Sequence, residues 1–156
     1  KENFDISSLK DYIKYAWKWN GSNWEIYIPD NYPDLIKKAK EYGLSFFTEV
    51  KPLEGVWIYS NYDLDIEGGF SYGNYTLNLK NTWNLVGNPS FADLNFTDLY
   101  KSSNFTIAWV WNVNNQKWEV FIPPDNKELI EVAKKYNISL ISSLNGTDYK
   151  GFWLKK

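Results

Sequence analysis

The sequence predicts an α+β fold made of two tandem related units, each a small antiparallel β-sheet with one packed helix. Three observations lead to this prediction. The segment AWKWN, a short turn and WEIYIP return later in the chain as AWVWN, a turn and WEVFIP. Residues alternate between two faces along these segments, as in a β-strand, and an apolar stripe with helical spacing follows each pair. One structural unit is therefore expected to occur twice.

The repeat sets the expected domain boundaries. We expect a first unit over residues 1–61, a linker or strand over residues 62–74, and a second unit over residues 75–156. The second unit opens with YTLNLKNTWNLVGNP, residues 75–89, which reads as two strands. The first unit has no such segment, so it is expected to lack its opening strands.

The missing segment leads to two further expectations. Its counterpart in the first unit would precede Lys1, which suggests a sequence cut from a longer protein. The first unit is also expected to borrow a strand, from residues 62–80 or from another molecule, because an unpaired edge strand invites pairing. A strand-exchanged oligomer is one form that such borrowing would take.

The remaining elements follow the same order in both units. A short helical or irregular piece is expected first, over residues 5–13 and 92–101. Two strands come next, joined by the turns NGSN and NVNNQK, whose Asn and Gly residues tolerate tight backbone geometry. After the helix, LSFFTEV and ISLIS each predict a strand, and GVWIYS and GFWLKK each predict the closing strand.

The two main helices have sequence signals at their ends. In the first unit Pro33 suits the opening turn and Gly43 can close the helix. In the second unit Asp125 can cap the helix and Asn137 stands at its end. The apolar stripes expected on these helices are Leu35, Ile36, Ala39 and Tyr42, and Leu129, Ile130, Ala133 and Tyr136.

Composition excludes several classes of function. The 156 residues include 44% hydrophobic and 19% aromatic residues but no Cys or His, which excludes disulfides, Cys/His zinc sites and Ser-His-Asp catalysis. The net charge of -2 and the lack of Arg argue against nucleic-acid binding, which needs a basic surface. No apolar run approaches the roughly 20 residues that span a bilayer, so no membrane insertion is expected.

The ordered set NTWNLVGNP, AWVW, WEVFIP and GFWLKK resembles a Trp-rich repeat module of bacterial secreted and cell-surface proteins. That repeat reads Gly-Trp-Asn-Leu-(Ile/Val)-(Gly/Ser), then Trp-X-(Trp/Tyr), Trp-X-X-(Tyr/Phe)-X-Pro and Gly-(Tyr/Phe)-Trp-(Ile/Val/Leu). Residues 82–154 fit it except that Thr82 replaces Gly and the helix is longer, and residues 16–58 fit all but the opening strand. The resemblance implies a noncatalytic module, often near the end of large exported proteins.

Strand alternation sorts the aromatic residues into faces. Lys18 lies opposite Trp17 and Trp19 along its strand, which suggests that the Lys18 face meets water and the tryptophans point inward. The faces led by Trp24 and Trp118 contain further large apolar residues, so they are also expected in the core.

A minority of rings is expected to keep one side exposed. Lys155 marks a wet strand face that Trp153 shares, which makes Trp153 and its counterpart Trp57 the first candidates. Such rings either cover small hydrophobic gaps or form a platform for a sugar ring, whose hydroxyls nearby polar groups can bind. The candidate carbohydrate-binding residues are Trp57, Trp153, Tyr27, Phe121, Tyr59, Asn112 and Asn114.

One acidic segment has two readings. Asp63, Asp65 and Glu67 alternate along YDLDIEGGF and would share one face of a strand. They either form a solvated face before a Gly-Gly turn or resemble the start of a calcium loop. The twelfth position of such a loop would be Asn74 and not the usual Glu. Apart from this possible calcium ion, no cofactor is expected.

The sequence therefore favours a noncatalytic module of an exported cell-surface or extracellular protein that binds glycan or polysaccharide through exposed aromatics. The alternative is a structural or assembly repeat that contacts a surface protein by strand pairing. An enzyme is not expected, because Glu25 and Glu119 recur in separate units and would lie too far apart to flank one glycosidic bond. A binder should have coplanar exposed rings, whereas a spacer should have buried tryptophans and paired edges.

Overall fold

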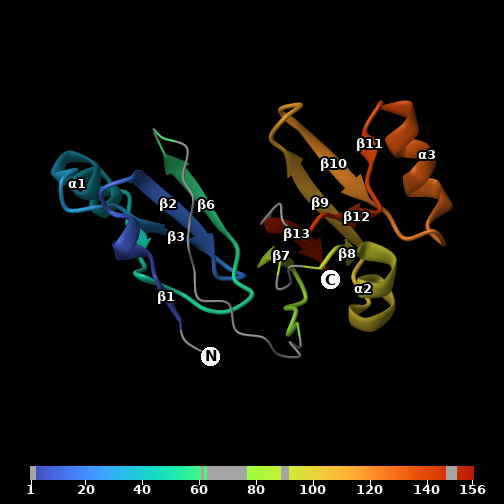
Figure 1. Cartoon of the computed structure of the whole chain (residues 1–156), viewed down its shortest axis with the longest axis horizontal. Helices are drawn as coiled ribbons and strands as arrows, with labels where there is room; N and C mark the ends of the chain where they lie inside the picture. The colour runs from blue at the N-terminus through green and yellow to red at the C-terminus, as the bar shows by residue number, and fades with distance from the viewer. Residues whose placement is uncertain (1–2, 61, 63–76, 89–91, 147–150) are drawn as a thin grey trace. The chain divides into compact units, whose positions relative to one another are not determined.

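The computed structural model describes residues 3–60, 62, 77–88, 92–146 and 151–156. The chain divides into two compact units, Lys1–Tyr75 and Thr76–Lys156. Each unit combines small sheets with packed helical segments, so the expected α+β fold class is confirmed (Figure 1). The expected linker 62–74 lies outside the described residues except for Tyr62.

The first unit is built on a four-stranded sheet with the strand order β4-β3-β2-β6 and a two-stranded sheet made of β1 and β5. Its described elements are β1 (Phe4–Asp5), the 3-10 helix η1 (Ile6–Leu9), β2 (Ile13–Trp19), β3 (Trp24–Tyr27), α1 (Pro33–Glu41), β4 (Ser45–Phe46), β5 (Glu49–Val50) and β6 (Val56–Ser60).

The second unit repeats this arrangement and extends it by one strand. Its five-stranded sheet has the order β11-β10-β9-β13-β7, and β8 and β12 form a two-stranded sheet. Its described elements are β7 (Trp83–Gly87), β8 (Leu94–Asn95), α2 (Phe96–Ser103), β9 (Ile107–Asn112), β10 (Lys117–Phe121), α3 (Lys127–Lys135), β11 (Ser139–Leu140), β12 (Ser143–Leu144) and β13 (Gly151–Lys155).

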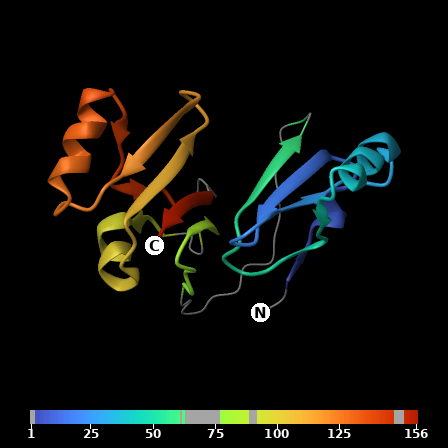
Figure 2. The same cartoon turned by 180° about the vertical axis from the view of Figure 1, so that it is seen from behind.

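Both large sheets are mixed and not purely antiparallel, which corrects the prediction. β3 pairs with β4, and β10 with β11, in parallel. The cause is the helix between these strands. A crossover helix carries the chain back to the end of the sheet at which the previous strand began, so the next strand runs in the same direction. Figure 1 shows α3 beside β11 and β10, and Figure 2 shows the same arrangement from behind.

Each large sheet is covered on both faces. In the first unit α1 packs through Ala39 on Ile26 and Ile28, while η1 packs through Ile6 on the opposite face, against Ala16. The second unit uses α3 on one face and α2 on the other. The short helical pieces expected over residues 5–13 and 92–101 are thus η1 and α2, and in the second unit α2 is a second packed helix in addition to α3.

The sequence signals at the helix ends are mostly confirmed. Pro33 opens α1, and Gly43 and Asn137 take positive φ values of 67° and 53° just beyond α1 and α3. The cap of α3 is Asn126, whose side chain accepts a hydrogen bond from the Leu129 amide, so the assignment of this role to Asp125 was wrong. The carboxylate of Asp125 instead accepts a hydrogen bond from Tyr100 at 3.0 Å.

The predicted extended segments differ in three places. LSFFTEV forms two short strands, β4 and β5, whereas ISLIS contains β11 alone and β12 follows directly after it, because the chain leaves the large sheet and joins the two-stranded one. Of the two strands expected in residues 75–89, the described part contains only β7, and residues 77–80 are irregular. In the described part of the chain β6 pairs with β2 alone. Residues 63–76, one suggested source of a borrowed strand, lie outside the described residues.

The helices in the described part of the chain are too short or too polar to cross a membrane.

Candidate functional site: the tryptophan faces of the two sheets

Strand register places all nine tryptophans on the sheet faces that also carry α1 or α3. Residues paired across antiparallel strands share a face, and alternate residues along a strand do so too. In the first unit this face, which we call the tryptophan face, contains Tyr15, Trp17, Trp19, Trp24, Trp57 and Tyr59. The tryptophan face of the second unit contains Trp83, Trp109, Trp111, Trp118 and Trp153.

The helices cover only part of these faces. Trp17 packs against the cluster under α1, and Trp109 against the cluster under α3. None of the nine tryptophans is fully buried, and Trp24 and Trp118 are each 38% exposed. These two residues hold equivalent positions at the start of β3 and just inside β10. The expectation that they lie in the core was therefore wrong, because α1 and α3 do not reach the hairpin ends.

Neighbouring tryptophan rings meet edge to face. The ring centroids of Trp19 and Trp24 are 5.4 Å apart with 64° between the planes, and those of Trp111 and Trp118 are 5.2 Å apart at 67°. Edge-to-face contact is a favoured aromatic geometry because the positive ring edge meets the negative ring face. These pairs are not the coplanar exposed rings expected of a binder from the sequence, so each exposed ring offers a separate surface.

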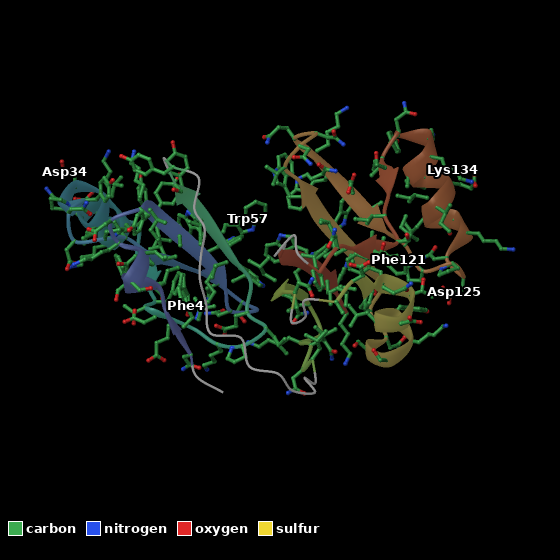
Figure 3. The ribbon with its side chains drawn as sticks, viewed as in Figure 1. Phe4, Asp34, Trp57, Phe121, Asp125 and Lys134 are labelled. Carbon is green, nitrogen blue, oxygen red and sulfur yellow. The ribbon has the colours of Figure 1, made fainter. Side chains whose placement is uncertain are left out.

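The candidates Trp57 and Trp153 lie on the tryptophan faces, each opposite another tryptophan. Trp57 pairs across the sheet with Trp17, and Trp153 pairs with Trp109. Both rings are half-buried, as expected for aromatics with one exposed side. Figure 3 labels Trp57 on its strand. Tyr59 is more exposed, at 47%, and its ring stacks on Tyr15 with 5.0 Å between centroids and 18° between planes.

Cations lie close to these faces. The Lys14 ammonium group is 5.9 Å from the Tyr59 ring centroid, and the Lys155 ammonium group is 5.8 Å from the Trp83 ring centroid. A lysine at this distance can bind a ring face or donate hydrogen bonds to a nearby hydroxyl. The wet face that Lys155 indicated in the sequence is thus the face that bears the tryptophans of the second unit.

Tyr27 and Phe121 do not belong to the exposed surface, which corrects the prediction for both. They are 8% and 4% exposed, and each lies on the face of its sheet that is opposite the tryptophan face. Tyr27 packs with Phe47, and Phe121 stacks on Phe96 of α2. Other elements of each unit cover this face. The neighbouring Glu25 and Glu119 suggested exposure, and nothing in the sequence pointed to the covering elements.

Lys18 does not lie on a solvent-exposed face, so that prediction was wrong. Among the described residues, it is the one charged residue that is buried. Its ammonium group lies 3.1 Å from the Glu49 carbonyl oxygen, 3.2 Å from Glu54 and 3.4 Å from Glu25. The Phe47 ring lies 5.0 Å from the same nitrogen. Burial of this charge is tolerated because carboxylates and a carbonyl replace the water around it.

Asn112 is a structural residue of the hairpin and lies on the face opposite the tryptophans. Its amide nitrogen donates to Glu119 at 2.8 Å, and its carbonyl oxygen accepts from the Asn115 amide. The first unit uses Asn20 and Glu25 in the same way, at 3.0 Å. Asn114 is exposed in the turn, where it is accessible to a ligand.

The acidic candidates for calcium, Asp63, Asp65 and Glu67, lie outside the described residues. In the described part of the chain, no three His, Cys, Asp or Glu side chains gather in a way that could hold a metal ion.

Sequence reasoning missed a polar hollow of about 640 Å³ in the second unit. It lies between the end of α2 and the start of α3, where the hydrogen bond from Tyr100 to Asp125 raises the pKa of the Tyr100 hydroxyl. No single motif could have revealed it, because its lining comes from two separate segments: Tyr100, Asn104, Phe105 and Thr106, and Pro123, Asp125, Asn126, Lys127 and Glu128.

Comparisons with protein-family models, with curated proteins and with solved structures found no match to this chain.

Proposed function

We propose that this chain is a noncatalytic module that binds glycan or polysaccharide through its two tryptophan faces. One observation carries the proposal. All nine tryptophans lie on these faces, none is fully buried, and the equivalent residues Trp24 and Trp118 are each 38% exposed. If these rings served only the core, we would expect them to be buried, because burial of large aromatic side chains strongly stabilises a small unit.

The chemistry of a sugar suits such rings. One face of a pyranose presents C–H groups, which carry a slight positive charge and are attracted to the negative face of an indole ring. Edge-to-face packing holds the rings of Trp24 and Trp118, and 38% of each residue remains exposed. Lys155 and Asn114 supply hydrogen-bond donors for hydroxyl groups near the second face.

We further propose that the module belongs to an exported cell-surface or extracellular protein. The resemblance to the Trp-rich repeat of such proteins supports this location, as does the fit of polysaccharides to that setting. We assign no catalytic residue, because Glu25 and Glu119 are held by Asn20 and Asn112 within separate hairpins.

The test is depletion of the protein from solution by insoluble cellulose, chitin, xylan and mannan. We expect binding to at least one polymer, and we expect the variant with both Trp24→Ala and Trp118→Ala to lose it. Trp57→Ala with Trp153→Ala tests the half-buried rings in the same assay.

The matched control is the pair Tyr42→Ala and Tyr136→Ala. These tyrosines occupy equivalent positions at the ends of α1 and α3 and are 81% and 67% exposed, but they lie outside the tryptophan faces. Binding should survive in this control. Binding through the tryptophan faces would be refuted if none of the four polymers removed the natural protein from solution. It would also be refuted if the Trp24/Trp118 variant and the Tyr42/Tyr136 variant lost binding equally.

A further inference from the structure

The polar hollow of the second unit has an apolar floor. Among its lining residues, Phe105, which is 1% exposed, and the buried Pro123 form that floor. The exposed residues Asn104, Thr106 and Asp125 stand around it. The volume of about 640 Å³ lies within the roughly 300–1,000 Å³ of pockets that bind small molecules. A ligand that suits the hollow therefore combines an apolar surface with several hydrogen-bonding groups.

The side chain of Tyr100 is held from two sides. Its hydroxyl donates to the Asp125 carboxylate at 3.0 Å, and its ring meets that of Phe105 edge to face, with 5.8 Å between centroids and 82° between planes. Phe105 packs in turn on Phe121 of β10. These contacts join α2 to the segment just before α3, where Figure 3 labels Asp125. Because the groups are fixed before a ligand arrives, binding costs less side-chain entropy.

The pair formed by Tyr100 and Asp125 can hold hydroxyl groups. A carboxylate accepts several hydrogen bonds, and Tyr100 occupies one of these positions on Asp125. The same bond raises the pKa of the Tyr100 hydroxyl, so this hydroxyl keeps its proton at neutral pH. Its oxygen can still accept a hydrogen bond from a ligand. Two neighbouring hydroxyls of one ligand can therefore donate to Asp125 and to Tyr100 at the same time.

The charges around the hollow favour a neutral ligand. The lining contains two carboxylates, Asp125 and Glu128, and one ammonium group, that of Lys127, so negative charge is in excess. This excess would repel an anionic group such as a phosphate or a uronic acid. Asn104 and Thr106 add neutral groups that both donate and accept hydrogen bonds. Such a mixture matches the hydroxyl groups of an uncharged sugar.

The hollow is separate from the tryptophan face of the same unit. It lies where β9 begins and β10 ends, whereas Trp111 and Trp118 lie at the other end of this hairpin. Ile107, which follows Thr106 of the hollow, is four residues from Trp111, or about 13 Å along a strand. A ligand in the hollow therefore leaves the exposed ring of Trp118 free to bind elsewhere.

We propose that this hollow is a further carbohydrate site, which binds a short stretch of a neutral sugar chain beside Tyr100, Asp125 and Asn104. The site extends the proposed function and rests on it for the class of ligand. The C–H face of a sugar lies on the apolar floor and the Tyr100 ring. The sugar hydroxyls donate to Asp125 and exchange hydrogen bonds with Asn104 and Thr106.

The test is titration of the intact chain with cellotriose, triacetylchitotriose, xylotriose and mannotriose, followed by amide chemical shifts. We expect at least one trisaccharide to give saturable shifts at Asn104, Thr106 and Asp125, with a Kd below about 10 mM. These shifts should persist with the same Kd in the protein that carries both Trp24→Ala and Trp118→Ala, because the hollow lies at the other end of the hairpin from Trp118.

A single hydroxyl provides the sharpest variant. Tyr100→Phe keeps the ring, and we expect it to weaken binding at the hollow about tenfold, because the ligand loses a hydrogen-bond partner and Asp125 loses the bond that positions it. Tyr136→Phe is the matched control, since Tyr136 is 67% exposed at the end of α3, and its Kd should be unchanged. Circular dichroism checks folding. Asp125→Asn, with a similar expected loss, serves if Tyr100→Phe does not fold.

The hollow and the tryptophan faces can fail separately. Depletion by a polymer without shifts at the hollow would refute the hollow and leave the tryptophan faces. Shifts at the hollow without depletion would support the hollow and refute the tryptophan faces. The hollow is also refuted if Tyr100→Phe and Tyr136→Phe bind the trisaccharide equally, or if the change of Trp24 and Trp118 to Ala removes the shifts at the hollow.

Discussion

Lys18 shows that equivalent positions in the two units can be filled by residues with different roles. In the first unit it is enclosed by Glu25, Glu54 and the Glu49 carbonyl oxygen. The second unit has Val110 at the equivalent place in β9, and that side chain is 1% exposed. One sheet face is thus closed by a charge cluster and the other by an apolar contact.

We expect Lys18→Met to lower the free energy of unfolding by about 2 kcal/mol, because two partly buried carboxylates lose their cation while the side chain keeps a similar volume. Urea unfolding measures the change. Lys37→Met, on the exposed surface of α1, is the control and should change stability by less than about 0.5 kcal/mol. Equal effects of the two substitutions would mean that the Lys18 cluster adds nothing specific.

Tyr27 gives the first unit a dependence on alkaline pH. Burial raises the pKa of its hydroxyl, and the charges of Asp30, Asp5 and Asp11 raise it further. The folded state therefore keeps this proton to higher pH than the unfolded chain, in which tyrosine ionises near pH ~10. The stabilisation is fully present below that pH and is lost as the pH rises through the folded pKa.

The comparison with Tyr27→Phe isolates this contribution, since all other groups titrate alike in both proteins. We expect the stability of the natural protein to fall more steeply above pH ~10 than that of the variant. Urea unfolding at several pH values measures both slopes. Parallel slopes would show that the Tyr27 hydroxyl has the same pKa in the folded and unfolded states.

At the scale of elements, the informative comparison is between β6 and β13. Both are closing strands, but β13 has neighbours on both edges and β6 has one described neighbour. In the second unit β7 lies along the outer edge of β13, and its Val86 shares a core cluster with Phe152 and Leu154. Leu154 is fully buried, whereas Ile58 is half-buried.

We expect Leu154→Ala to destabilise the second unit by about 3 kcal/mol and Ile58→Ala to destabilise the first by about 1 kcal/mol. The larger loss comes from the cavity that a fully enclosed side chain leaves behind. Native-state hydrogen exchange measures each unit separately through its own amides. Similar losses at both positions would mean that Ile58 is as enclosed as Leu154.

At the scale of the whole molecule, the chain carries two tryptophan faces of similar composition, one in each unit. Two sites on one chain can bind the same insoluble polymer, and the second contact then forms at a high effective concentration. The affinity of the whole chain should exceed that of either face without any new contact.

We therefore expect Trp24→Ala alone and Trp118→Ala alone each to weaken polysaccharide binding by about 10²-fold, leaving the affinity of one face. The double variant should fall below detection. Binding isotherms on the polymer found by depletion measure all three proteins. Loss of all binding in one single variant, with no change in the other, would show that only one face binds.

The sequence by itself determined the repeated pattern of elements and the alternation along each strand. The pairs AWKWN with WEIYIP and AWVWN with WEVFIP form hairpins as predicted, because period-two alternation and turn residues act over a few neighbours. It also placed Trp57 and Trp153 on a face with one exposed side. These features depend on local chain geometry, which the order of residues specifies directly.

Only the tertiary structure decided which face of each sheet remains accessible. The buried Lys18, the buried Tyr27 and Phe121, and the exposed Trp24 and Trp118 all reverse the expected assignment. Alternation separates two faces but does not say what covers them, and here η1, α2 and the two-stranded sheets cover the face that carries Lys18 and Phe121. The covering residues lie far away in sequence, so burial is a property of the packed unit and not of the strand.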